Sequence, residues 1–181
     1  MVRVAARQER PRVEPSSTVR RLLLPSPVGP LFVEYDDAAV RYIHFWPQGA
    51  HPPAGTRVEP TRDDPLGWKV AQQLREYFAG KRREFDLPLA PEGTEFRRRV
   101  WDALRTIPYG QTRTYGDIAD AVECRAPRAV GQANRHNPIP IVIPCHRVVG
   151  SDGIGGYAGQ WAKGEGLDRK RWLLRHEGVE V

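Results

Sequence analysis

The sequence predicts an α+β protein: a small N-terminal α/β domain with antiparallel strands, followed by a mostly helical C-terminal domain. Two observations predict this fold class. Short β-prone runs separated by turn residues fill residues 20–46, as in antiparallel strands. From residue 94 onward, apolar residues recur at helical spacing and capping residues precede the expected helices. The 181 residues are enough for two small packed domains.

The N-terminal domain is expected to cover residues 20–89, after a mobile tail at residues 1–19 that is rich in Pro, Arg and Glu. Its strand-like runs are separated by turn signals, which predicts an antiparallel meander. These runs are Arg20–Leu24, Leu31–Tyr35 and Val40–Phe45.

The rest of this domain contains one helix. We expect a loop over Pro47–Pro60, because proline and glycine are frequent there. Apolar residues at helical spacing then predict a helix over Pro65–Ala79, which Gly80 ends. Phe85–Leu89 is expected to be a short extended piece.

The C-terminal domain, residues 93–181, is expected to contain a helix-turn-helix. Thr94 can cap its first helix, and a second is expected over Tyr115–Val122. Pro127 stands at the first position of a third helix, which ends near Arg135. The second and third helices are joined by a tight turn, so the later one would be the recognition helix.

A proline-rich segment and a final helix complete the domain. Asn137–Pro144 is apolar but contains three prolines, which argues against a central strand. The last helix is expected over Asp168–His176, with Gly178 behind it.

The composition excludes several classes of protein. Apolar residues make up 40% and charged residues 28% of the chain, which is ordinary globular usage. No run approaches the about 18 apolar residues of a membrane span, and the N-terminus lacks the apolar core of a secretory signal. Two cysteines are too few for a disulfide scaffold or a four-ligand zinc site. We therefore expect a protein of the prokaryotic cytoplasm, associated with the nucleoid, without a membrane partner, metal or other cofactor.

The charge permits a nucleic acid partner. Lys plus Arg is 28 against 22 for Asp plus Glu, a formal net charge of +6, and only four of the cations are lysines. Arginine suits phosphate contacts because its guanidinium offers a planar fork of donors. A GC-rich genome would produce the same bias, so the charge alone does not establish DNA binding.

The candidate nucleophile is Cys145, which is followed by His146 and Arg147. Neighbouring cations favour the thiolate form of a cysteine. Adjacent residues of an extended chain point to opposite sides, so a bridging water would carry the proton to His146 and a carboxylate would hold the imidazole. A buried structural cysteine beside a surface histidine is the alternative.

Six motifs occur in a fixed order around this cysteine. They are Pro108-Tyr109-Gly110-Gln111-Thr112, Thr114-Tyr115-Gly116-Asp117-Ile118-Ala119, Arg128-Ala129-Val130-Gly131, Asn137-Pro138, Pro144-Cys145-His146-Arg147-Val148-Val149-Gly150 and Gly155-Gly156-Tyr157. In this order and spacing they resemble the O6-alkylguanine-DNA alkyltransferases, the methylated-DNA–protein-cysteine methyltransferases. The resemblance is strong over Gly93–Val181 and weaker over Arg20–Leu89, where it implies a ribonuclease H-like domain.

The resemblance implies single-use DNA repair. Duplex DNA bearing O6-alkylguanine would be bound, the base turned out of the stack, and the alkyl group transferred to Cys145. The protein would be a monomer in solution, with cooperative binding along DNA left open. A cysteine hydrolase is one alternative, and it needs an oxyanion hole near the nucleophile. A non-catalytic binder of alkylated DNA is the other, and the presence of Cys145 argues against it.

The resemblance also implies roles for five residues of the reaction centre. Cys145 would accept the alkyl group, His146 would act through water as general base, and Glu177 would orient His146. Asn137 would brace the active-site turn, although it can equally cap a helix. Tyr115 would hydrogen-bond the flipped guanine and donate a proton to it, or else be a core aromatic.

For DNA, the resemblance implies minor-groove docking of the recognition helix. Arg128 would take the place of the flipped base in the stack, with a plain phosphate contact as the alternative. Small side chains, Ala133 among them, would allow close approach to a narrow groove, but they also suit helix packing. The other expected DNA contacts are Thr114, Ala126, Ala129, Gln132 and Arg135.

The walls of the guanine pocket come from two segments. The expected pocket residues are Pro140, Val148, Tyr157, Ala158 and Gly159, although Pro140 can equally be an ordinary loop proline. Ala158 departs from the family pattern, which has serine there. Residues 160–167 form a longer loop than is usual in the family, and we expect it to alter access for bulky alkyl groups or to contact DNA.

Overall fold

A four-stranded sheet forms the N-terminal half of the protein. The structure is a computed structural model that describes residues 18–151, 153–155 and 164–181, so most of the predicted mobile tail lies outside the described residues. The strands are β1 (Arg20–Leu24), β2 (Leu31–Tyr35), β3 (Val40–Phe45) and β4 (Thr56–Arg57). The first three pair antiparallel, as predicted, and β4 adds parallel to β1 in the order β3-β2-β1-β4. The expectation of a plain loop over Pro47–Pro60 was therefore wrong at β4, whose two residues are too few to show an alternation.

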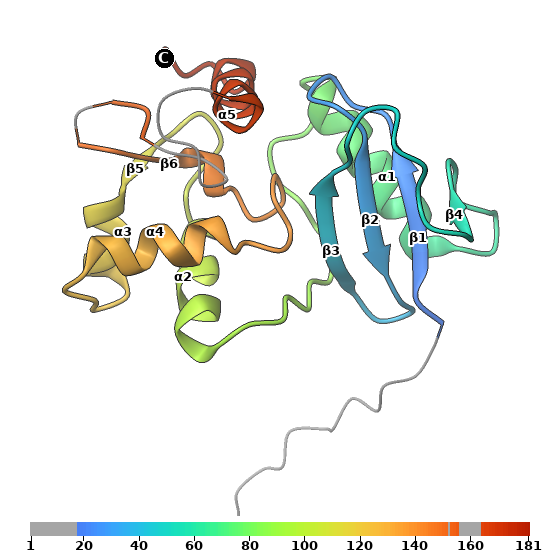
Figure 1. Ribbon diagram of the computed structural model, residues 1–181, viewed down its shortest axis with the longest axis horizontal. Helices are drawn as coiled ribbons and strands as arrows, with labels where there is room; N and C mark the ends of the chain where they lie inside the picture. The colour runs from blue at the N-terminus through green and yellow to red at the C-terminus, as the bar shows by residue number, and fades with distance from the viewer. Residues whose placement is uncertain (1–17, 152, 156–163) are drawn as a thin grey trace, which may run out of the picture.

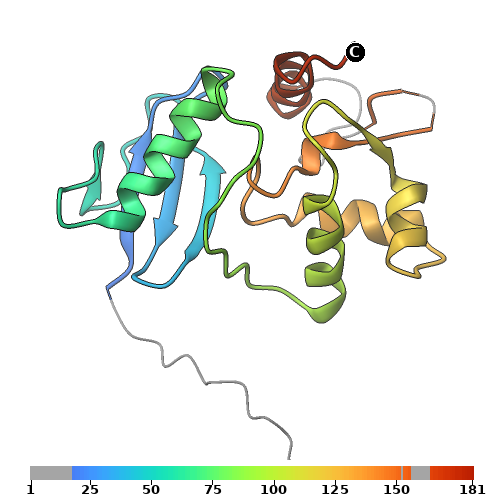
Figure 2. The same ribbon diagram turned by 180° about the vertical axis from the view of Figure 1, so that it is seen from behind.

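Helix α1 (Pro65–Phe78) covers one face of this sheet (Figure 2). Asp64 caps the helix by accepting a hydrogen bond from the Gly67 N–H at 3.0 Å, and proline occupies the first turn. Alternate residues of the strands and the apolar stripe of α1 share one core. Its buried members include Leu22, Leu31, Val33, Ile43, Val70, Leu74 and Tyr77.

Four helices make up the C-terminal half. They are α2 (Glu95–Arg105), α3 (Tyr115–Ala121), α4 (Pro127–Arg135) and α5 (Glu165–His176). Thr94 and Thr114 cap α2 and α3, as the sequence predicted. Helix α5 begins at Glu165 and not at Asp168, as was expected. Gly166 lies in its first turn, and the low helix propensity of glycine is why the sequence indicated a later start.

Two short strands that the sequence did not reveal hold the start of the helix-turn-helix against the residues that follow the Cys145 turn. β5 (Arg113–Thr114) directly precedes α3 and pairs in parallel with β6 (Val148–Val149). This pairing brings the start of α3 beside the residues that follow Cys145. Two-residue strands leave no periodicity in a sequence, so only the fold discloses them.

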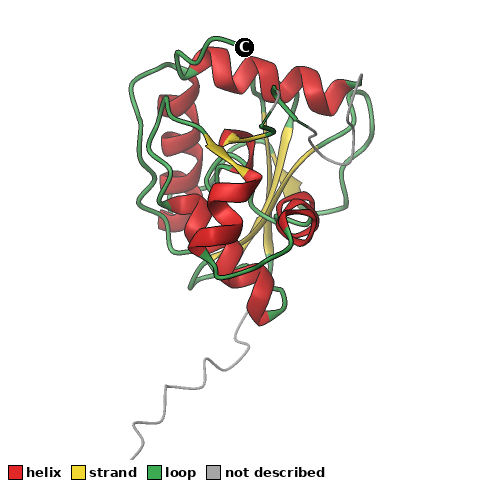
Figure 3. Ribbon diagram, turned by 90° about the vertical axis from the view of Figure 1, so that its left-hand side faces the viewer, coloured by secondary structure: helices red, strands yellow, loops and turns green. Residues whose placement is uncertain are grey.

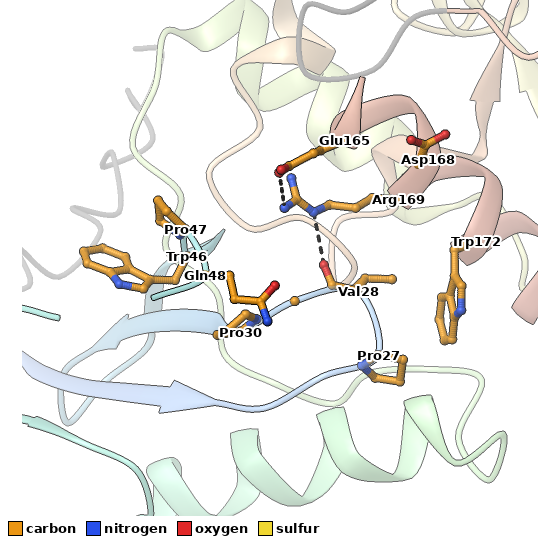
Figure 4. A pocket seen from close by; sticks show the side chains of 11 residues that line it. Pro27, Val28, Pro30, Trp46, Pro47, Gln48, Glu165, Asp168, Arg169 and Trp172 are labelled. Atoms are coloured by element: carbon orange, nitrogen blue, oxygen red, sulfur yellow. Dashed lines mark hydrogen bonds and ion pairs between the residues drawn. The ribbon is translucent and has the colours of Figure 1, made fainter. Parts of the chain in front are cut away.

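Helix α5 runs across the top of the helical half, on the side next to the sheet (Figure 1, Figure 3). Its Arg169 donates from Nε to the Val28 carbonyl in the β1–β2 turn at 3.1 Å, and it also pairs with Glu165. A surface cavity of about 530 Å³ lies at this junction, with Trp46 and Trp172 on opposite sides of Arg169 (Figure 4). Contacts on α5 therefore tie both halves together. In the described part of the chain, no helix has the length and apolar character needed to cross a membrane.

We predict that Trp101→Phe lowers the free energy of unfolding by about 1–3 kcal/mol, because it removes a hydrogen bond and packed volume from the core. Trp101 is 1% exposed and donates its indole N–H to the Ala133 carbonyl at 2.9 Å, joining α2 to α4. Urea denaturation measures the change. Trp68→Phe is the control, since Trp68 is 40% exposed, and equal losses in the two variants would contradict the prediction.

Candidate functional site

The candidate nucleophile lies in a tight turn. Cys145, His146 and Arg147 form a single 3₁₀ turn, in which the Arg147 N–H donates to the Pro144 carbonyl at 3.0 Å. The expectation of an extended chain here was wrong. With three residues per turn, successive side chains are about 120° apart and do not alternate between two sides. Cys145 is buried, with 4% of its surface exposed.

Two asparagines hold the backbone of this turn. Asn137 donates from Nδ2 to the Ile143 carbonyl at 2.7 Å, and its Oδ1 accepts from the Ile139 N–H at 3.0 Å. Asn134 donates from Nδ2 to the Cys145 carbonyl at 3.2 Å. Between these anchors, Ile141 has a φ of 75°, a conformation that a β-branched residue rarely adopts. The asparagine bonds therefore fix a backbone that would not form by local preference.

Glu177 is the acceptor at the centre of the site. It is 5% exposed and follows α5 directly. Its Oε1 accepts from His146 Nε2 at 2.8 Å and from the Tyr77 hydroxyl at 2.8 Å. Arg147 donates to both carboxylate oxygens, from Nε at 2.8 Å and from Nη2 at 3.0 Å, and the Gly110 N–H lies 3.3 Å from Oε2. Segments from both halves of the chain thus meet at one carboxylate.

The electrostatics of this cluster set the protonation of His146. Burial alone would raise the pKa of Glu177, but the bonds and charges of His146 and Arg147 outweigh it and hold the pKa well below its ordinary value. Burial lowers the pKa of His146, although Glu177 opposes this shift. A neutral His146 that donates from Nε2 to Glu177 has its free lone pair on Nδ1. Nδ1 is then the basic atom of the pair.

A buried lysine also faces the reaction centre. Lys170 on α5 is 0% exposed and donates from Nζ to the carbonyls of Val148 and Ile154, both at 2.6 Å. Burial lowers the pKa of Lys170 to about 8, while negative charge on Cys145 acts in the opposite direction. Lys170 was not predicted from the sequence. Its spacing from Leu167, Leu173 and Leu174 places it on the apolar face of the last helix, and that was the available signal.

Tyr115 begins α3 and is half-buried. Burial raises its pKa, a hydrogen bond with Asn134 lowers it, and charge on Cys145 raises it again. The hydroxyl is therefore protonated near neutral pH. The glycine turn packs against this ring: Gly155 has a φ of 67°, and a Cβ there would lie 2.8 Å from Gly150 N and 3.3 Å from Tyr115 Cε2. Only glycine fits this close approach.

The outer face of α4 is basic and exposed. Arg128, Gln132 and Arg135 are exposed and lie at helical spacing on one face of the helix, while Val130 and Asn134 are buried on the other. Ala126 is exposed and Ala129 half-buried. Of the two alternatives for Ala133, helix packing holds and approach to a groove does not, because this residue is 2% exposed and packs in the core. Thr114 is half-buried, and its side chain caps α3.

The predicted guanine pocket is only partly described. Pro140 and Val148 are buried beside the turn of Cys145. Tyr157, Ala158 and Gly159 lie outside the described residues, as do residues 160–163 of the longer loop. Among the residues that the structure describes, no group of three or more His, Cys, Asp or Glu is arranged to hold a metal ion.

Two family models match the chain. The model "6-O-methylguanine DNA methyltransferase, ribonuclease-like domain" matches residues 19–91, and "6-O-methylguanine DNA methyltransferase, DNA binding domain" matches residues 95–179. The chain belongs to the 6-O-methylguanine DNA methyltransferase family.

Curated proteins and solved structures of this family are similar over most of their lengths. A methylated-DNA–protein-cysteine methyltransferase of Methanosarcina acetivorans is 42% identical over 163 residues, which cover 84% of this chain and 94% of the relative. One from Mycobacterium bovis is 45% identical over 154 residues, covering 84% and 88%. The crystal structure of the Mycobacterium tuberculosis O6-methylguanine methyltransferase has a TM-score of 0.73 at 42% identity and covers 88% of this chain and 93% of its own. Its structure in complex with DNA has a TM-score of 0.72 at 41% identity, covering 88% and 92%.

The family, the α+β fold class and the enzyme class predicted from the sequence are confirmed. The structure brings Cys145, His146, Glu177, Asn137 and Tyr115 into one region, while the roles given to them stay predictions. Sequence reasoning missed three further side chains of this site, which are Tyr77, Asn134 and Lys170. It named Arg147 as a cation beside the cysteine but did not predict its bonds to Glu177.

We predict that the free energy of unfolding rises as the pH increases from about 8 to 10.5, by at most about 3 kcal/mol, because of Lys170. Its folded pKa lies below the unfolded value, so the unfolded chain binds more protons in this window. Stability is therefore gained as the pH rises through it and lost as the pH falls. Urea titrations of the parent and of Lys170→Met measure the difference, which disappears in the variant. The same pH dependence in both proteins would show that another group is responsible.

Proposed function

We propose that the protein repairs duplex DNA by moving the alkyl group of O6-alkylguanine to Cys145 Sγ, once per molecule. The observation that carries the proposal is the buried chain from Glu177 to His146, next to Cys145 in the same turn. Family membership supports DNA repair by alkyl transfer to a cysteine as the reaction class. The single turnover and the flipped base are our proposal.

The residues present allow a balanced transfer. His146 Nδ1 takes the thiol proton, through the predicted bridging water, and the thiolate attacks the alkyl carbon. A C–S bond forms as the C–O6 bond breaks, and the bonding pair leaves on the guanine. The protonated Tyr115 hydroxyl supplies a proton to the departing base. The C–S bond of a thioether is stable and does not readily break again, so each molecule reacts once.

The basic face of α4 supports DNA as the partner. Arg128, Gln132 and Arg135 are exposed together on it, and a Mycobacterium tuberculosis relative has been solved in complex with DNA. We propose that this helix docks in the minor groove and that Arg128 fills the space left by the flipped base. Repair must ignore sequence, so phosphate contacts dominate the affinity.

Other expectations stay predictions alongside this proposal. They are the monomeric state, cooperative binding along DNA, the cytoplasmic location, the domain boundaries at residues 20–89 and 93–181, and the roles of Pro140, Val148 and the segment 157–167. Shortening the loop at residues 160–167 tests whether it contacts DNA or controls access for bulky alkyl groups. The measurements are the DNA affinity and the rates of transfer from methyl and benzyl adducts.

Intact-mass spectrometry tests the function directly. We predict that mixing with DNA containing O6-methylguanine adds one CH₂ unit to the protein and that the gain stops at one per molecule. The gain is lost in Cys145→Ala and kept in Cys124→Ser, because Cys124 lies after α3, on the helix-turn-helix, where its Sγ contacts the Ala126 carbonyl. Repeated release of methylated product without a retained mass gain would indicate a hydrolase. Binding without any mass gain would indicate a non-catalytic binder.

We predict that replacing Arg128 and Arg135 together with Ala weakens DNA binding and lowers the log–log salt slope by about one for each phosphate that the variant no longer neutralises. Fluorescence anisotropy at several salt concentrations measures both quantities. Arg75→Ala is the matched control, because Arg75 is an exposed arginine of α1, paired with Glu59. An unchanged slope in the double variant would place the DNA on another surface.

A further inference from the structure

We infer that Tyr77, which belongs to the N-terminal half, is a positioning residue for alkyl transfer that acts through Glu177 on His146. The inference rests on the proposed function, since it concerns the same reaction centre. It assigns to the sheet-bearing half a direct part in the chemistry of Cys145.

Tyr77 and His146 both donate a hydrogen bond to the same oxygen, Oε1 of Glu177. Tyr77 is 0% exposed and lies in the last turn of α1, and its hydroxyl donates to Glu177 Oε1 at 2.8 Å. His146 Nε2 donates to that same Oε1, also at 2.8 Å. Arg147 Nη2 is the third donor to this oxygen, at 3.0 Å. Donors on one oxygen share its negative charge, so each of them weakens the bonds of the others.

Several contacts hold Tyr77 in this place. Its carbonyl accepts from His176 Nε2 at 2.7 Å, and its ring packs edge-on against the His176 ring with centroids 5.2 Å apart. The Tyr109 hydroxyl donates to the His176 carbonyl at 3.0 Å. The end of α1 is thus fixed to the end of α5, one residue before Glu177.

The hydroxyl can only act as a donor. Burial and the negative charge of Glu177 raise the pKa of Tyr77, so it stays protonated. Among the described residues, the other ionisable groups that act on Glu177 or His146 are Tyr109 ahead of β5, Arg147 in the 3₁₀ turn and Lys170 on α5, and Cys145 precedes His146 in the same turn.

Removing the hydroxyl therefore has a defined consequence. Without Tyr77 as a donor, Oε1 interacts more strongly with His146, and the pKa of His146 rises. Arg147 and the Gly110 N–H still hold the carboxylate in place. His146 is then protonated at a higher pH, where it no longer accepts the thiol proton.

The test compares Tyr77→Phe with Tyr35→Phe, both in a Cys124→Ser background that leaves Cys145 as the single cysteine. Tyr35 is the matched control because it is also 0% exposed and donates to a buried carboxylate, that of Asp64, within the N-terminal half. The rate of Cys145 alkylation by free O6-benzylguanine is followed by intact mass against pH. We expect the acid limb of the profile to move upward by about half a pH unit in Tyr77→Phe, a roughly threefold slower reaction on that limb. We expect no movement in Tyr35→Phe.

An unmoved acid limb in Tyr77→Phe overturns the inference. A loss of rate that is the same at every pH also overturns it, if Tyr35→Phe loses rate in the same proportion to its own loss of stability. That result would show a merely structural role for Tyr77. A parent protein that takes up neither a benzyl group from O6-benzylguanine nor a methyl group from DNA containing O6-methylguanine would instead refute the proposed function. Iodoacetamide, which needs no guanine, then decides the inference: the same upward movement of the Cys145 profile in Tyr77→Phe supports it, and its absence overturns it.

Discussion

The buried carboxylate of Glu177 is the constraint on which the site depends. A carboxylate without partners is costly to bury, and here it accepts hydrogen bonds from Tyr77, Gly110, His146 and Arg147. These donors come from α1, the loop before β5 and the 3₁₀ turn, so satisfying one anion requires the tertiary fold to close. The same requirement places His146 beside Cys145 with its Nε2 already engaged. Stability and chemistry therefore share one set of contacts.

The turn of Cys145, the proposed nucleophile, is held by a second set of hydrogen bonds, which go to backbone groups. Asn134 and Asn137 together bond the carbonyls of Cys145 and Ile143 and the N–H of Ile139. In the proposed transfer, a rigid turn keeps the Cys145 sulfur in one position, so the entropy of ordering it is not lost during the reaction. Burial of Cys145 to 4% exposure also shelters the thiol from reagents that are not guided to it.

The sequence carried the local features of the fold and only part of the site. Caps at Thr94 and Thr114, the β-prone runs and turn signals of the first three strands and the helical stripes were readable, because each depends on neighbours in the chain. The pairing of β5 with β6 and the bond between Tyr77 and Glu177, one hundred residues apart, depend on the tertiary fold. The turn at Cys145 was misread as extended, since long-range asparagine bonds and not local propensity fix its shape. Lys170 on the apolar face of α5 was the one missed residue with a readable local signal.

The tautomer of His146 tests the central claim most directly. Nitrogen-15 NMR of the imidazole distinguishes the two neutral forms and the imidazolium. At neutral pH we expect a neutral ring with its proton on Nε2, donated to Glu177, and a free lone pair on Nδ1. A proton on Nδ1 of a neutral ring, or an imidazolium, would contradict the assignment of His146 as the base held by Glu177.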